Sequence, residues 1–172
     1  MPDLHALIRA VPDFPTAGVV FRDITPLLAD PPGFARCLDR LAEPWQGYAV
    51  HAVCAVEARG FIFGAALAER LGAGFVPLRK PGKLPPPVVT LAYELEYARD
   101  HLEIRADALS AGQRVILVDD VLATGGTLVA TRALVGQLGA RVLGASVVIE
   151  LADLGGRERW GAEQPLHALV NC

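Results

Sequence analysis

Short apolar runs alternate with stretches of helical length along most of this chain. The run VILV at 115–118 has no polar position on either face, which is typical of a strand buried on both sides of a parallel sheet. Gly72 and Gly139 each follow an apolar helical stretch, in the position that glycine favours at helix ends. The alternation predicts an α/β fold whose central, mainly parallel sheet is flanked by helices and connected by right-handed crossovers. The expected strands are 49–56, 74–80, 114–120 and 141–151, and the expected helices are 61–71 and 127–138.

Two segments break this alternation. Residues 81–107 begin with PGKLPPP, which excludes a helix interior because proline lacks an N–H group and clashes with the preceding turn. They continue as two extended arms, 88–97 and 100–107, around Ala98 and Arg99. Residues 14–28 contain a glycine and prolines and follow neither the helix nor the strand period. Irregular segments attached to a rigid sheet are common places for binding sites, so we expect both to contribute to function.

Two adjacent acids and a small-residue loop follow the run 115–118. Asp119 and Asp120 stand where that strand is expected to end, and open α/β sheets bind ligands outside the carboxyl ends of their strands. The glycines of the loop ATGGT at 123–127 let backbone N–H groups approach an anion closely. A helix starting near Thr127 would point its positive end at the same place. The loop therefore suits a phosphate monoester, and the two carboxylates suit the hydroxyls of a sugar.

The same residues allow a plainer interpretation, in which the acids only cap a turn and 123–127 is an ordinary strand-to-helix loop. The acid pair directly after a fully apolar run makes this alternative the weaker one. The loop also lacks the GK[ST] ending of a P-loop, and no GxGxxG follows a strand. ATP-driven phosphoryl transfer and dinucleotide binding are therefore disfavoured.

Composition and charge narrow the class of protein. Hydrophobic residues make up 52% and charged residues 20% of the 172, which is ample for a packed core. The net charge of −3 predicts no nucleic-acid partner, and no apolar run reaches the roughly 18 residues of a membrane span. The first residues do not have the pattern of a secretory signal, and the three cysteines form neither a disulfide framework nor a zinc motif. We expect a cytoplasmic protein with no membrane association.

The segment VILVDDVLATGGT resembles the motif with which type I phosphoribosyltransferases bind 5-phosphoribosyl-1-pyrophosphate (PRPP). The resemblance implies the fold of that family over one domain, 1–172, with a small hood from about 11–28 and the C-terminal part, and a flexible lid arm at about 87–105. It implies that Asp119 and Asp120 hold the ribose 2′- and 3′-hydroxyls. The residues implied to cradle the 5′-phosphate are Ala123, Thr124, Gly125, Gly126 and Thr127.

Three further segments, 14–28, 57–85 and 93–109, resemble the adenine-specific members of that family. These segments and the PRPP motif stand in the family's order along the chain. They imply an enzyme of purine salvage, a pentosyltransferase that joins adenine to PRPP and gives AMP and pyrophosphate. They also imply Mg²⁺ as a cofactor carried by the substrate rather than by a dedicated protein site, and a homodimer.

Recognition of adenine needs groups that accept from its 6-amino group and donate to ring N1. An oxo-purine reverses both demands, so a site with fixed backbone groups would leave them unpaired and reject the wrong base. The resemblance assigns this task to the backbone of Val20, Phe21 and Arg22, with Phe21 and Leu151 flanking the ring. On composition alone Val20 and Phe21 would be core residues, and the family match reverses that preference.

Four basic residues are implied to bind pyrophosphate. Arg59 follows the strand 49–56 within EARG, where the resemblance also suggests a strained turn with a non-proline cis peptide. A guanidinium fork suits phosphate oxygens. Arg79, Lys80 and Lys83 form a basic cluster in an acidic protein, and the family uses these positions partly from the neighbouring subunit. The alternative is a solvated basic loop.

The lid arm carries the residues implied to act on the reacting groups. Glu96 resembles the family's acid/base residue at the imidazole edge of the purine, and Tyr97 would help to close the site. Without the resemblance, Glu96 would be taken for an exposed strand charge. Ala98 replaces the glycine that often follows this pair in the family, which stiffens the expected bend.

Two competing functions remain open at this stage. One is a phosphoribosyltransferase for another purine base, because the PRPP motif does not specify the base. The other is a regulatory protein that binds PRPP without reacting, but the chain has no spare segment or basic face for the DNA-binding module that such proteins carry.

Overall fold

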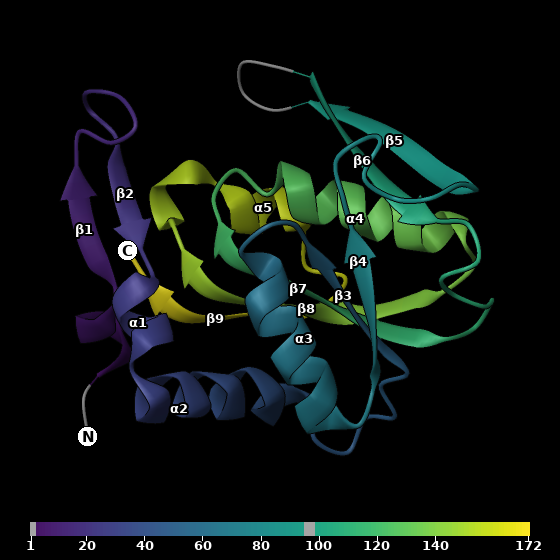
Figure 1. Ribbon diagram of the computed structural model, residues 1–172, viewed down its shortest axis with the longest axis horizontal. Helices are drawn as coiled ribbons and strands as arrows, with labels where there is room; N and C mark the ends of the chain where they lie inside the picture. Colours follow the sequence, from purple (N-terminus) through teal and green to yellow (C-terminus); the bar gives the residue numbers. More distant parts are fainter. Residues whose placement is uncertain (1–2, 95–98) are drawn as a thin grey trace.

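A five-stranded parallel sheet forms the centre of the computed structural model, which describes residues 3–94 and 99–172 (Figure 1). Its strand order is β4-β3-β7-β8-β9, and neighbouring strands run parallel. Because the strands are parallel, their carboxyl ends meet at one edge, which is the edge that carries the predicted site. The strands are β3 (Ala52–Val56), β4 (Gly74–Leu78), β7 (Arg114–Leu122), β8 (Arg141–Glu150) and β9 (Leu166–Asn171).

Helices cover both faces of this sheet. Val53 and Ala55 of β3 point to one face, where they pack with α1 (Thr25–Ala29), α2 (Pro31–Ala42) and α3 (Gly60–Leu71). Cys54 and Val56 point to the other face, towards α4 (Gly126–Gln137) and α5 (Gly156–Trp160). Figure 1 shows α2 and α3 below the sheet and α4 above it. The arrangement confirms the predicted α/β class, with a central parallel sheet flanked by helices.

Two antiparallel ribbons extend from this body. One pairs β1 (Arg9–Pro12) with β2 (Val20–Asp23), and the other pairs β5 (Val88–Glu94) with β6 (Arg99–Arg105). The second ribbon confirms the predicted extended arms over 88–94 and 100–105, whereas 95–97 lie outside the described residues. It joins the edge of the sheet through Arg79 and Glu103, whose backbone groups exchange hydrogen bonds of 3.0 and 2.7 Å. Short 3₁₀ turns occur at Leu4–Leu7, Glu43–Trp45 and Ala152–Leu154.

Several predicted boundaries shift because pairing, rather than hydrophobicity, decides where a strand ends. β3 begins at residue 52 instead of 49, where its register with both neighbours begins. β7 continues past Asp120 because Val121 and Leu122 still pair with β8. Helix α2 was not among the elements predicted from the sequence, although its start has a recognisable capping pattern, in which Asp30 Oδ2 accepts the N–H of Gly33 at 2.8 Å.

A buried polar contact joins the sheet to the segment after α2. The indole Nε1 of Trp45 donates to Oγ of Ser146 at 2.8 Å, and both side chains are almost inaccessible to solvent. Ser146→Ala should leave this N–H without its acceptor and lower the free energy of unfolding by about 1–3 kcal/mol, measured by urea denaturation. Ser110→Ala, on an exposed turn, is the control with little expected change. Equal stability of the Ser146 variant would show that the indole finds another acceptor.

Candidate active site

The loop after β7 forms a small cavity at the carboxyl edge of the sheet. A hollow of about 120 Å³ is lined by Asp119 and by residues 121–128, so all five residues predicted to cradle the phosphate, 123–127, lie around it. Gly125 has a φ of 78°, a conformation that glycine adopts without strain, and α4 begins at the next residue. The N-terminal N–H groups of α4 therefore start at the wall of the cavity, which suits an anion.

The loop rests on the N-terminus of α5. A Cβ added at Gly156 would lie 2.2 Å from the carbonyl oxygen of Ala123, and one added at Gly125 would lie 2.7 Å from the carbonyl oxygen of Gly156. These two backbones approach so closely that neither position accepts a side chain without movement. Gly156 is far from the loop in sequence, so no sequence pattern links it to the phosphate site.

The two acids diverge as neighbours on a strand do. Asp119 faces the phosphate cavity, and its Oδ1 accepts the N–H of Asp120 at 2.9 Å. Asp120 points elsewhere and its Oδ2 lies 2.7 Å from Nε of Arg59. Burial raises the pKa of both carboxyl groups; the charge of Asp120 raises that of Asp119 further, whereas the Arg59 guanidinium partly offsets the rise at Asp120.

A second cavity, of about 150 Å³, lies between β2 and the sheet edge. It is lined by the four predicted base residues Val20, Phe21, Arg22 and Leu151, together with Val19, Arg59 and Val121. The guanidinium carbon of Arg59 stands 5.1 Å from the centre of the Phe21 ring. Nε of Arg22 is a buried donor that finds no acceptor in the described residues, as expected where a ligand supplies one. Val121 lines both cavities, so the two share a wall.

The basic cluster is organised by Glu57, which was not among the predicted site residues. The largely buried carboxylate of Glu57 accepts from Nη2 of Arg79 at 3.1 Å, from Nζ of Lys83 at 3.2 Å and from the backbone N–H of Lys80. Burial alone would raise the pKa of Glu57, but these donors lower it. The peptide bond from Glu57 to Ala58 is cis, as the resemblance suggested. The fourth predicted pyrophosphate residue, Arg59, pairs with Asp120 instead of with Glu57.

Comparisons with known proteins agree with this geometry. The model of the phosphoribosyl transferase domain matches residues 34–163. The chain is 54% identical to the adenine phosphoribosyltransferase of Synechococcus sp. (strain JA-3-3Ab) over 169 residues, which cover 98% of this chain and 97% of the relative. The chain belongs to the adenine phosphoribosyltransferase family. The relative from Xanthomonas axonopodis pv. citri (strain 306) is also 54% identical, over 95% of this chain and 88% of its own length.

Solved adenine phosphoribosyltransferases share the fold. The crystal structure of the enzyme from Rhodothermus marinus DSM 4252 superposes with a TM-score of 0.94 at 46% identity, over 98% of this chain and 96% of that one. The Saccharomyces cerevisiae structure, a complex with an imino-altritol bisphosphate and adenine, gives 0.90 at 39% identity over 96% of both chains. The predicted type I phosphoribosyltransferase fold is thereby confirmed.

Two residues that the resemblance to adenine phosphoribosyltransferases assigned to a lid have no described position. Glu96 and Tyr97 lie outside the described residues, as does Ala98, so their roles stay predictions from the resemblance. In the described part of the chain, no cluster of three or more His, Cys, Asp or Glu side chains could hold a metal ion. Over the same residues, no helix has the length and apolar character needed to cross a membrane.

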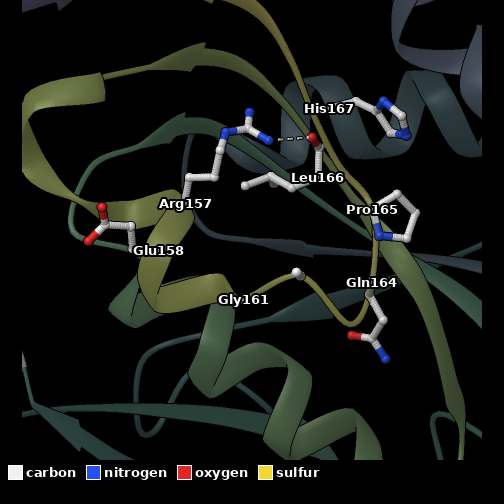
Figure 2. Close-up of a pocket in the computed structure, with 8 residues that line it drawn as sticks. Arg157, Glu158, Gly161, Gln164, Pro165, Leu166 and His167 are labelled. Atoms are coloured by element: carbon white, nitrogen blue, oxygen red, sulfur yellow. Dashed lines mark hydrogen bonds between the residues drawn. The ribbon is translucent and has the colours of Figure 1, made fainter.

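A larger cavity, of about 660 Å³, lies apart from the predicted residues of this adenine phosphoribosyltransferase family member (Figure 2). It is lined by residues 157, 158, 161, 162 and 164–167, between α5 and the start of β9. Arg157 uses its donors internally: Nη1 bonds the carbonyl oxygen of Leu166 at 2.9 Å, the dashed line in Figure 2, and Nε bonds Glu150 at 2.8 Å. This cavity is larger than the other two, but the polar groups of Arg157 are already paired within the protein. The two smaller cavities, with their convergent polar groups, are therefore the better candidates for the active site.

Proposed function

We propose that this chain transfers the 5-phosphoribosyl group of PRPP to adenine and releases pyrophosphate, as an enzyme of purine salvage. The observation that carries the proposal is the pair of cavities that share Val121 as a wall. One cavity offers a glycine loop and a helix N-terminus to a phosphate, and the other offers the apolar side chains of Phe21 and Leu151 to a base. A nucleoside monophosphate needs these two features next to each other.

The ribose phosphate would occupy the first cavity. The amides and hydroxyls of residues 123–127 would cradle its 5′-phosphate, with the positive end of α4 behind them. Asp119 and Asp120 would accept the ribose 2′- and 3′-hydroxyls. In this arrangement Asp120 would bind the sugar while it lies next to Arg59, whose Nε is 2.7 Å from Asp120 Oδ2. Support for these roles comes from the clustering of Asp119 and the loop residues around one cavity.

Adenine would lie in the second cavity, against Phe21 and Leu151. The backbone of residues 20–22 would accept from its amino group and donate to N1, which an oxo-purine cannot match. The buried, unpaired Nε of Arg22 supports a polar ligand here. A hydrogen bond from the Arg22 side chain to the ligand would add to the backbone contact that the resemblance assigned to this residue.

Pyrophosphate would meet Arg59, Arg79, Lys80 and Lys83. Departure of pyrophosphate leaves positive charge on the sugar and negative charge on the leaving group, so positioning and electrostatics carry most of the catalysis. The carboxylates of Asp119 and Asp120 are hard oxygen ligands that would help to hold a Mg²⁺ ion carried by PRPP, and the ion would supply charge neutralisation for the leaving group. Glu96, on the lid, would exchange the proton at the purine imidazole edge.

The remaining proposals concern assembly and surroundings. The ribbon of β1 and β2 would be the hood over the base, and the β5–β6 hairpin the lid that keeps water from the reactive sugar. A homodimer would bring basic residues of one subunit towards the other's pyrophosphate. A cytoplasmic location fits the three free thiols.

An assay with PRPP, Mg²⁺ and each purine base tests the function. We expect adenine to be used with a kcat/KM at least about 10⁴-fold above hypoxanthine or guanine, because unpaired buried groups penalise the wrong base heavily. AMP formation is measured by chromatography. A preference for hypoxanthine or guanine would reject the adenine assignment and keep the fold. Tight PRPP binding without turnover of any base would instead indicate a regulatory protein.

A further inference from the structure

Lys80 is tied to both strands of the β5–β6 hairpin. Its Nζ pairs with Oδ2 of Asp100 on β6 and lies 3.5 Å from Oη of Tyr93 on β5. Oη of Tyr93 donates to the same Oδ2 at 3.2 Å, and the ammonium stands 5.8 Å from the centre of the tyrosine ring. A lysine that the family resemblance assigns to pyrophosphate is therefore held by two side chains of the proposed lid.

The three groups form a connected polar set. Tyr93 and Asp100 are register partners in the antiparallel ladder, so their side chains leave the hairpin on the same face. The lysine side chain is 37% exposed and the aspartate 26%, so the pair is partly shielded from solvent. Burial alone would lower the pKa of Lys80, but the hydrogen bond to Asp100 raises it, which keeps the ammonium charged.

The base of the hairpin is attached to the core and to the segment that carries Lys80. Leu102 and Ile104 are completely buried in the core on the α4 side of the sheet. Glu103, between them, exchanges backbone hydrogen bonds with Arg79 and accepts the N–H of Gly82 at 3.1 Å. The basic segment 79–83 and the lower part of the hairpin thus form one unit.

We propose that Asp100 and Tyr93 are positioning residues for Lys80, which orient its ammonium before the pyrophosphate of PRPP arrives. This inference rests on the proposed function. An unrestrained lysine loses much rotamer freedom when it binds an anion, and a lysine that is already ordered avoids that loss. Three donors on the ammonium allow it to keep Asp100 while it donates to a phosphate oxygen.

These partners of Lys80 cannot be read from the sequence pattern, because residues 80, 93 and 100 meet only through the hairpin register. A different interpretation is that Asp100 competes with pyrophosphate for Lys80, in which case its removal would tighten binding. Another is that the contact stabilises the hairpin without acting on the lysine's role. The direction of the effect and its dependence on Lys80 separate these interpretations.

The experiment compares Asp100→Asn, Tyr93→Phe, Lys80→Met and the double variant Lys80→Met/Asp100→Asn with the wild type as full chains. The readouts are the KM values for PRPP and adenine, the inhibition constant of inorganic pyrophosphate with Mg²⁺, and the melting temperature. Asp107→Asn is the matched control, because Asp107 lies just beyond the same hairpin and pairs with Arg105 at 2.6 Å instead of with Lys80.

We expect Asp100→Asn to raise the PRPP KM and the pyrophosphate inhibition constant about three- to tenfold, with a smaller rise for Tyr93→Phe and an unchanged adenine KM. In the Lys80→Met background, Asp100→Asn should add nothing further. Unchanged or tighter pyrophosphate binding in Asp100→Asn, or effects that multiply independently in the double variant, would overturn the proposal. If the wild type makes no AMP, the proposed function fails, and calorimetry of pyrophosphate binding to the same variants still decides this inference.

Discussion

Replacement of Asp119 by asparagine should cut kcat/KM for PRPP about 10- to 150-fold while making the folded protein more stable. The loss follows from the proposed hydrogen bond between the carboxylate and a ribose hydroxyl, since bonds to charged groups contribute about 1.5–3 kcal/mol. The shape of the side chain is preserved, and the asparagine oxygen can still accept the N–H of Asp120 that Asp119 accepts at 2.9 Å. Steady-state kinetics at varied PRPP measure the first effect.

The gain in stability follows from the raised pKa of Asp119, caused first by burial and then by the charge of Asp120. At a pH below the ordinary pKa of 3.8, the carboxyl group is protonated in both the folded and the unfolded chain. Its burial then does not lower the stability of the folded chain through ionisation. As the pH rises through 3.8 towards the raised value, the unfolded chain ionises first, so the stability of the wild type falls. Asparagine has no such cost.

Melting temperatures of both proteins between about pH 4 and pH 8 check this sign. The difference in favour of Asp119→Asn should be small at the acidic end and grow as the pH rises. Asp39→Asn serves as the control, because Asp39 pairs with Arg70 between α2 and α3, away from both cavities. Full activity in Asp119→Asn would remove this carboxylate from ribose binding.

Gly156→Ala should damage the phosphate loop without touching the motif itself. The new methyl group would lie 2.2 Å from the carbonyl oxygen of Ala123 and 3.0 Å from the side chain of Leu122, so the loop or α5 must move. Overpacking of this kind costs about 1–3 kcal/mol of stability. Because small displacements of positioning groups reduce rates strongly, kcat/KM for PRPP should fall about 10- to 100-fold.

Gly136→Ala provides the matched comparison. Gly136 lies within α4, and an added Cβ would meet no atom within 4 Å. Since glycine inside a helix costs roughly 0.5–1 kcal/mol relative to alanine, this variant should be slightly more stable and fully active. Urea denaturation and PRPP kinetics measure both variants. A wild-type KM in Gly156→Ala would show that the loop does not depend on its contact with α5.

The phosphate half of the site was predictable because its parts are contiguous in sequence. Asp119, Asp120 and the loop 123–127 follow one apolar strand, and the geometry of a parallel sheet then dictates that they stand at its carboxyl edge. The length of that strand was not predictable to the residue. Its last two residues remain in the ladder because β8 pairs with them, and a hydropathy pattern does not report pairing.

The contacts between residues that are distant in sequence could not be predicted from the sequence. Glu57 accepts hydrogen bonds from Arg79 and Lys83, and Gly156 packs against Ala123, only because the fold brings separate segments together. The base residues were found through the family resemblance, since Val20 and Phe21 look like ordinary core positions. For Glu96 and Tyr97 the resemblance remains the whole basis, because they lie outside the described residues.

The wall at Val121 separates two parts of the molecule with different origins. The phosphate cavity is formed by the sheet and α4, whereas most of the base slot comes from the N-terminal ribbon. Residues 19–22 could therefore be exchanged for the corresponding stretch of a relative with another base preference while the sugar-phosphate machinery stays intact. Such a modular layout makes this short ribbon the natural target for engineering an enzyme that accepts unnatural nucleobases.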